Sequence, residues 1–203
     1  MTKFEIFFQL GIEHIADFAG YDHILFIITL CGVYQLSNWK NVLVLVTAFT
    51  IGHSITLALA TLNILFIPSE IIEFLIPLTI IITALANIVS RKIDFSFRLH
   101  WFKYLLAMFF GLIHGLGFSN YLRSLLDIEE SMFQPLLAFN LGLEVGQIAI
   151  VLIILVISIL FVKIFRTPVR EWNLVVSGIG LGIAFLLLVE RFPAVAPVFL
   201  DVL

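Results

Sequence analysis

Charged residues and cysteine are both scarce in this chain, and each scarcity excludes a class of protein. Only 12% of the 203 residues are charged, about half the share of a soluble domain, whereas 62% are hydrophobic and the mean hydropathy is +1.16. A water-soluble enzyme, a disordered tail and a nucleic-acid-binding module are excluded, the last also because the net charge is −3. The single cysteine, Cys31, excludes a disulfide framework and a cysteine-rich metal cluster.

Long apolar runs are what the chain has in quantity. A helix that crosses the hydrocarbon core needs about 20 apolar residues. The runs predict about six transmembrane helices, near residues 21–36, 42–66, 71–90, 101–121, 135–162 and 172–189. Residues 1–19 carry too many polar groups for exposure to lipid and predict a short amphipathic or re-entrant segment, not a signal peptide. The expected fold is an all-α polytopic helix bundle in the lipid bilayer, with residues 1–203 as one membrane domain.

Basic residues are unevenly distributed between the predicted loops. Eight of the eleven Lys and Arg residues follow the first, third and fifth helices: Lys40, Arg91, Lys92, Arg98, Lys103, Lys163, Arg166 and Arg170. The opposite side carries acids instead: Glu70, Asp127, Glu129, Glu130 and Asp201. Because cytoplasmic loops are rich in Lys and Arg, we expect both termini on the non-cytoplasmic side of a bacterial inner membrane. A faint similarity between residues 50–53 and 112–115 is too short to indicate an inverted repeat.

Ionisable residues inside the predicted helices are few, and we expect them to be functional because each costs about 3 kcal/mol to insert. Counting about 1.5 Å of rise per residue places His23, His53 and His114 in one layer, about 20 Å from the cytoplasmic surface of the core. Glu73 and Glu144 come out slightly further outward on the same count. Imidazole and carboxylate without thiolate suit Zn, Ni, Co or Fe better than Cu(I), Mg or Ca. The layer therefore predicts a site for a divalent transition metal.

Further polar residues extend this predicted site. Asp22 either binds the metal directly or fixes the tautomer of an imidazole. Asn140 and Gln147 share one helix stripe with Glu144, as a pathway wall would require. The predicted metal ligands are His14, Asp22, His23, His53, His114 and Glu144. The predicted surrounding or pathway residues are Asp17, Glu73, Asn140 and Gln147, while Glu190 and Arg191 predict an ion pair at a helix end.

Several of these residues lie in motifs that resemble the HupE/UreJ family of small membrane proteins. The matching segments are Gly11-Ile-Glu-His14, Gly20-Tyr-Asp22-His23-Ile-Leu-Phe26, Phe49-Thr-Ile-Gly-His53-Ser-Ile-Thr-Leu57, Glu73-Phe-Leu-Ile-Pro77, Gly111-Leu-Ile-His114-Gly-Leu-Gly-Phe118 and Phe139-Asn-Leu-Gly-Leu-Glu144-Val-Gly-Gln147. The resemblance implies a membrane protein that passes nickel, or cobalt, toward hydrogenase or urease assembly. Metallochaperones or maturation proteins of those enzymes are the implied partners. The spacer between His14 and Asp22 is longer than in the similar motif of nickel/cobalt permeases.

Two functions of different classes remain open at this point. The first is transport of Ni, Co or Zn through the intramembrane His/Asp/Glu site, which the resemblance favours. The second is an intramembrane metal-dependent hydrolase of a lipid or lipoprotein, in which the metal keeps one position open for water. In that enzyme Glu144 or Glu73 would act as general base and Ser54 would orient the substrate. Bis-histidine haem ligation is disfavoured, since no Cys-x2-Cys-His attachment motif occurs.

Overall fold

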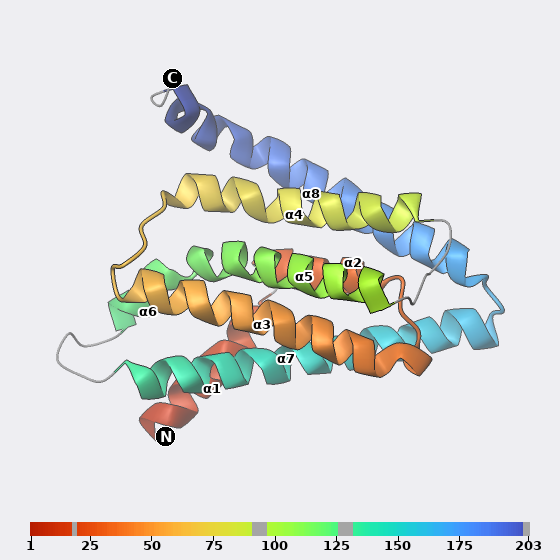
Figure 1. Cartoon of the computed structure of the whole chain (residues 1–203), viewed down its shortest axis with the longest axis horizontal. Coiled ribbons are helices and arrows are strands. Elements are labelled where there is room, and N and C mark those ends of the chain that lie inside the picture. The colour runs from red at the N-terminus through yellow and green to blue at the C-terminus, as the bar shows by residue number, and fades with distance from the viewer. Residues whose placement is uncertain (18–19, 91–96, 126–131, 201–203) are drawn as a thin grey trace.

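The chain folds into α-helices that pack side by side in one bundle (Figure 1). The computed structural model describes residues 1–17, 20–90, 97–125 and 132–200, and no strand occurs within those ranges. The α-helices are α1 (Lys3–Ile15), α2 (Asp22–Cys31), α3 (Trp39–Thr61), α4 (Ser69–Val89), α5 (Phe97–Gly117), α6 (Ser119–Leu125), α7 (Phe133–Ile159) and α8 (Val169–Leu200). A 3₁₀ turn, η1 (Leu36–Asn38), precedes α3, and a π-helical turn, η2 (Leu160–Ile164), follows α7. The all-α prediction is confirmed.

The lengths and apolar composition of the helices are those of a membrane protein. Among the described residues, four helices are long and apolar enough to cross a bilayer: Leu36–Thr61, Ser69–Val89, Phe133–Ile164 and Val169–Val198. Two shorter apolar helices, Asp22–Cys31 and Trp101–Gly117, fall where the remaining two crossings are predicted. The membrane-bundle class is confirmed, whereas the count of six crossings stays a prediction. The polar N-terminal segment forms α1, which begins at a capping box between Thr2 and Glu5.

The helix predicted over 42–66 ends earlier, at Thr61. Asn63 has a φ of 57°, the left-handed conformation that commonly ends helices. The backbone N–H groups of Asn63 and Ile64 then donate to carbonyls of the preceding turn, at 3.1 and 2.9 Å. Hydropathy alone misses this boundary, because the residues after Asn63 are as apolar as those before it.

Three helix pairs account for most of the bundle: α1 with α7, α3 with α5, and α4 with α8. Glycines allow the first two pairs to pack backbone against backbone. A Cβ added to Gly11 would overlap the carbonyl oxygen of Phe139 in α7, and one added to Gly111 would overlap that of Phe49 in α3. Small residues at such contacts let membrane helices approach closely. The glycines therefore fix which faces of these four helices meet.

The contacts of α1, α3 and α4 are mirrored by those of α5, α7 and α8, which is the pattern of an inverted repeat, whereas α2 and α6 pack differently. In this pattern α1 corresponds to α5, α3 to α7 and α4 to α8. Glycines bring α1 onto α7 in the same way as they bring α5 onto α3, and α4 packs directly on α8. Counterparts run in opposite directions, as Figure 1 shows most plainly for α4 and α8. The repeat makes His14 and His114 equivalent, since they lie three residues after Gly11 and Gly111.

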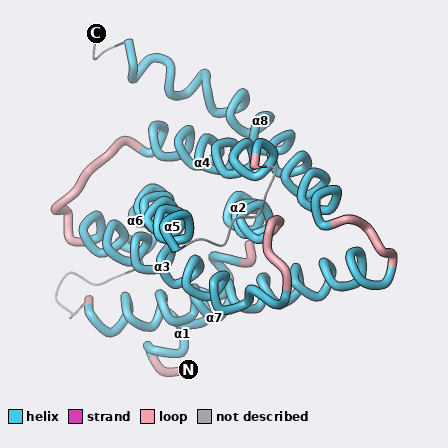
Figure 2. Tube along the Cα trace, turned by 45° about the vertical axis from the view of Figure 1, so that its right-hand side comes forward, coloured by secondary structure: helices cyan, strands magenta, loops and turns pink. Residues whose placement is uncertain are grey.

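The short helix α2 lies inside the bundle, against α4, α7 and α8 (Figure 2). Most of its residues are buried, including Asp22 and His23 in its first turn. The described residues between α1 and α2, which are Ala16, Asp17, Gly20 and Tyr21, are not helical. Non-helical backbone in a membrane protein is tolerated where protein or a water-filled cavity surrounds it. The break therefore delivers two polar side chains to the interior of the bundle.

The two ends of the bundle differ in charge. The helix α1 begins and α8 ends at one end, here called the terminal end, and α3, α5 and α8 begin at the other (Figure 1). Basic residues gather along the chain at that other end, here called the basic end: Lys40, Arg98, Lys103, Lys163, Arg166 and Arg170. The predicted loop residues Arg91, Lys92, Asp127, Glu129, Glu130 and Asp201 lie outside the described residues.

We expect Gly111→Ala to destabilise the protein by about 1 to 3 kcal/mol, because its Cβ would overlap the carbonyl of Phe49. Gly182→Ala is the matched control, since nothing lies within 4 Å of the Cβ position there and alanine favours the helix. Thermal unfolding in detergent measures both variants. A wild-type midpoint for Gly111→Ala would contradict the close contact between α3 and α5.

Candidate metal centre

Four histidines from four different helices converge inside the bundle. His14 lies near the end of α1, His23 at the start of α2, His53 in α3 and His114 in α5. One ring nitrogen from each of His14, His23 and His53 lies within 4.8 Å of the other two. The ring of His114 lies 5.0 Å from that of His23, centroid to centroid. His53 and His114 are fully buried and His23 is 5% exposed. These four residues are called the histidine cluster below.

Ring nitrogens of the histidine cluster are buried without hydrogen-bond partners. They are His14 Nε2, His23 Nε2, His114 Nδ1 and both nitrogens of His53. The Oδ1 atom of Asn140 is likewise buried without a hydrogen-bond partner. A buried polar atom without a partner costs about 1 to 3 kcal/mol and is uncommon in native proteins. Several such atoms in one place indicate that a ligand belongs there.

Asp22 holds the imidazole of His23 in position. Its Oδ1 accepts a hydrogen bond from the backbone N–H of His23 at 2.9 Å and lies 3.0 Å from Nδ1 of the same ring. This contact assigns the proton to Nδ1 and leaves the Nε2 lone pair facing the cluster. The other oxygen of Asp22 accepts from the Arg191 guanidinium at 3.3 Å. Because both oxygens have partners, the geometry favours an orienting role for Asp22 over direct ligation.

Thr79 of α4 orients His114 in a similar way. The Thr79 hydroxyl donates to the carbonyl of Ile76 at 2.7 Å, and its oxygen lies 3.1 Å from His114 Nε2. With its single proton already donated, the hydroxyl accepts from Nε2–H. The lone pair of His114 Nδ1 is therefore available to a ligand.

A cavity of about 400 Å³ opens from the histidine cluster toward the terminal end and is called the vestibule. His14, His23 and His114 line it on the inside. Its charged residues are Asp17, Asp22, Glu73 and Arg191. Three carboxylates against one guanidinium make the vestibule acidic overall, which raises the local concentration of cations.

The structure does not bring Glu144 into the histidine cluster. Its Oε1 accepts a hydrogen bond of 2.7 Å from the hydroxyl of Thr47. Thr47 precedes His53 in α3 and therefore lies closer to the basic end than His53 does. Gly142 faces α1, and two residues along an α-helix correspond to a rotation of about 200°. Glu144 therefore faces away from α1 and His14. Helix rise predicts Glu144 further outward than the histidines, and the structure places it on the other side of them.

The remaining predicted residues occupy three different settings. Glu73 and Asp17 are exposed and line the vestibule. Gln147 is buried and accepts a hydrogen bond of 2.8 Å from Thr50, so it joins α7 to α3. Ser54 donates to the carbonyl of Thr50 at 2.7 Å, which leaves its hydroxyl proton unavailable to a substrate.

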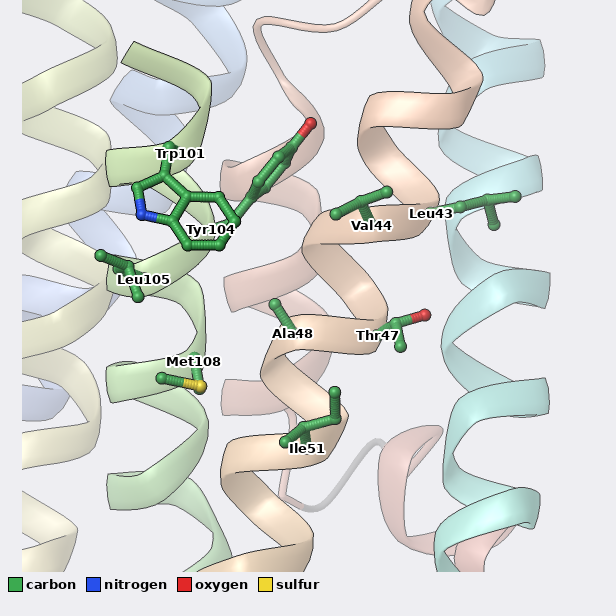
Figure 3. Close-up of a pocket in the computed structure, with 9 residues that line it drawn as sticks. All are labelled: Leu43, Val44, Thr47, Ala48, Ile51, Trp101, Tyr104, Leu105 and Met108. Carbon is green, nitrogen blue, oxygen red and sulfur yellow. The ribbon is translucent and has the colours of Figure 1, made fainter. Parts of the chain in front are cut away.

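A separate groove of about 350 Å³ lies between α3 and α5 (Figure 3). Its lining is almost wholly apolar and includes Ile51, Leu105 and Met108. Figure 3 shows Thr47 turned away from α5, toward its contact with Glu144. With no imidazole or carboxylate among its lining residues, the groove is not a second metal site.

Two residues of the site were missed by sequence reasoning. Arg191 does not serve mainly as a partner of Glu190, because it reaches Asp22 and also donates to the carbonyl of Glu73 at 2.8 Å. An arginine on the side of the protein that carries few basic residues was the available signal. Thr79 gave a weaker signal, as one of two threonines within a long apolar run.

The fold and the site together define a class, a polytopic α-helical membrane protein with a buried imidazole cluster open toward one end. Within that class the chain belongs to the HupE/UreJ family, because the family model described as HupE / UreJ protein matches residues 1–191. The resemblance seen in the motifs is thereby confirmed, and the family is associated with nickel/cobalt transport. No curated protein and no solved structure matches the chain significantly.

Proposed function

We propose that the protein binds a divalent transition metal ion, nickel or cobalt, at the histidine cluster and carries it across the membrane. The observation that carries this proposal is the set of buried imidazole nitrogens without partners. Neutral imidazoles are ligands suited to Ni, Co and Zn. Orientation of His23 by Asp22 and of His114 by Thr79 is the arrangement that typically surrounds metal-binding histidines.

The position of the cluster within the repeat supports transport. His14 and His114 are equivalent positions of the two halves, and both line the vestibule. Transporters built from inverted repeats commonly bind their substrate at the interface of the halves, beside broken helices. The break between α1 and α2 lies directly beside His14 and His23. The metal would enter through the acidic vestibule and exchange its water ligands for imidazoles.

The charge difference between the two ends supports an orientation. We infer that the basic end faces the cytoplasm, because cytoplasmic segments carry an excess of Lys and Arg. The vestibule and both termini then face outward from a bacterial inner membrane. Metal released at the basic end would be available to metallochaperones or to hydrogenase and urease maturation proteins.

A second candidate function, the intramembrane hydrolase, is favoured by one observation. Toward the basic end, Phe26 and Phe49 pack on His114, each with a ring distance of 5.2 Å. A metal in the cluster is therefore reached through the vestibule, as a hydrolytic site would be. Glu144 would not be the general base of this enzyme, since its carboxylate bonds Thr47 and does not face the histidine cluster. Of the two predicted bases, only Glu73 remains a candidate.

After loading with Ni²⁺, the purified protein should contain about one transition metal ion per chain. His23→Ala and His53→Ala should each abolish metal binding, because a site built from few ligands cannot lose one imidazole and still hold the ion. His100→Ala is the matched control, since His100 lies about 21 Å from His114 along α5. Elemental analysis measures all four proteins. Equal and negligible metal in all of them would refute both candidate functions.

Asp22→Asn should weaken Co²⁺ binding by about 10-fold to 100-fold, the usual effect of removing a carboxylate that orients a metal-binding histidine. Asp17→Asn removes a different carboxylate of the same vestibule, and should change affinity far less. Absorbance titration with Co²⁺ compares the two variants. If Asp22→Asn and Asp17→Asn bound Co²⁺ with equal affinity, Asp22 would act through its negative charge alone and not by orienting His23.

Proteoliposomes decide between transport and hydrolysis. We expect the wild-type protein to take up labelled Ni²⁺, because in transport the bound ion leaves on the opposite side. We expect His23→Ala to lose uptake, because it lacks one imidazole of the histidine cluster. Metal that stays bound without exchange, in vesicles that show no flux, would reject transport and support the hydrolase.

A further inference from the structure

A second, smaller cavity lies on the basic-end side of the histidine cluster. Its volume is about 50 Å³. Tyr34, which follows α2, Thr83 and Asn87 of α4, and Lys103 and Phe110 of α5 contribute to its lining. The Lys103 ammonium lies 5.5 Å from the centre of the Tyr34 ring, a position that holds this charge against an aromatic face. The lining of the second cavity is thus partly polar.

A polar stripe on α4 joins the histidine cluster to this cavity. Thr79, Thr83 and Asn87 are spaced four residues apart, so they lie on one face of the helix, and all three are buried. Thr79 contacts His114, and Thr83 and Asn87 line the cavity. The stripe spans about 12 Å along the helix axis. It runs from one polar site to the other through the apolar interior.

An aromatic layer closes the space beside the stripe. The Phe26 ring lies 5.2 Å from His114, 5.1 Å from Phe49 and 6.0 Å from Phe110, centroid to centroid. All three phenylalanines are buried in one apolar cluster. Phe110 also lines the cavity. Phe26 therefore lies between the histidine cluster and the second cavity.

We propose that the second cavity is the basic-end half of the metal pathway, with the Thr83 hydroxyl as a passing contact for the hydrated cation and Phe26 as the gate. This inference rests on the transport proposed above. The Thr83 hydroxyl donates to the carbonyl of Thr79 at 2.8 Å, so its lone pairs remain free to meet a cation or its water. Movement of one aromatic ring would join the cavity to the cluster.

The unequal cavities fit one state of an alternating cycle. The vestibule measures about 400 Å³ and the second cavity about 50 Å³. In transporters made of inverted repeats, one repeat moves against the other around a fixed site, which opens one side while it closes the other. The structure then represents the state open to the terminal end, and the second cavity widens in the other state.

Thr83→Val tests the polar contact, since valine keeps the shape and removes the hydroxyl. We expect unchanged Ni²⁺ content but Ni²⁺ uptake into proteoliposomes that is about threefold to tenfold slower, the effect of losing one hydrogen-bonding group. Thr56→Val is the matched control, because Thr56 is equally buried, bonds a carbonyl of its own helix and lies outside the cavity.

Phe26→Leu tests the gate, because it shortens the side chain without emptying the position. We expect bound Ni²⁺ to exchange with labelled Ni²⁺ on the basic-end side several times faster than in the wild type. Phe185→Leu, at a lipid-exposed position of α8, should exchange at the wild-type rate. Metal content after loading verifies that each variant is folded.

The two proposals fail in different ways. If the wild-type protein carries no Ni²⁺ flux, transport itself is refuted. If the wild type does carry flux, and Thr83→Val and Phe26→Leu both match it in uptake and exchange, the pathway is refuted while transport stands. Slower uptake in Thr83→Val together with faster exchange in Phe26→Leu supports the pathway.

Discussion

Close backbone contact between helices is the constraint on which this structure depends. Two packed helices gain little from apolar contact within a bilayer, because lipid tails are as apolar as leucine, and close packing has to supply the stabilisation. Gly11 with Gly142, and Gly111 with Gly52, bring α1 onto α7 and α5 onto α3. Each histidine of the cluster outside α2 lies within one turn of such a glycine. The contacts that hold the helices together therefore also bring the imidazoles together.

Burial gives the histidine cluster its chemical character. In water an imidazole nitrogen without a protein partner costs nothing, but inside the bundle it costs about 1 to 3 kcal/mol. Asp22 and Thr79 satisfy one nitrogen each of His23 and His114, so each of these two rings keeps one buried nitrogen without a partner. The cation that we propose to bind there would offset that cost, and its release would restore it. This balance suits an ion that binds and leaves.

The sequence predicted the parts of this structure that follow from composition and spacing. The all-α membrane class follows from apolar run lengths, and the meeting of His23, His53 and His114 follows from their similar depth. The position of Glu144 could not be predicted, because depth says nothing of the direction in which a side chain leaves its helix. The inverted repeat was hidden since its halves share little beyond glycines and a histidine. Both failures concern which helix faces which, a property that tertiary packing decides.

X-ray absorption at the nickel edge of the Ni²⁺-loaded protein identifies the atoms bound to the metal, and so tests whether the histidine cluster holds it. We expect a first shell of nitrogen with the outer scattering pattern of at least three imidazoles, the number brought within 4.8 Å of one another. A shell made of oxygen alone, or the absence of imidazole scattering, would contradict this expectation.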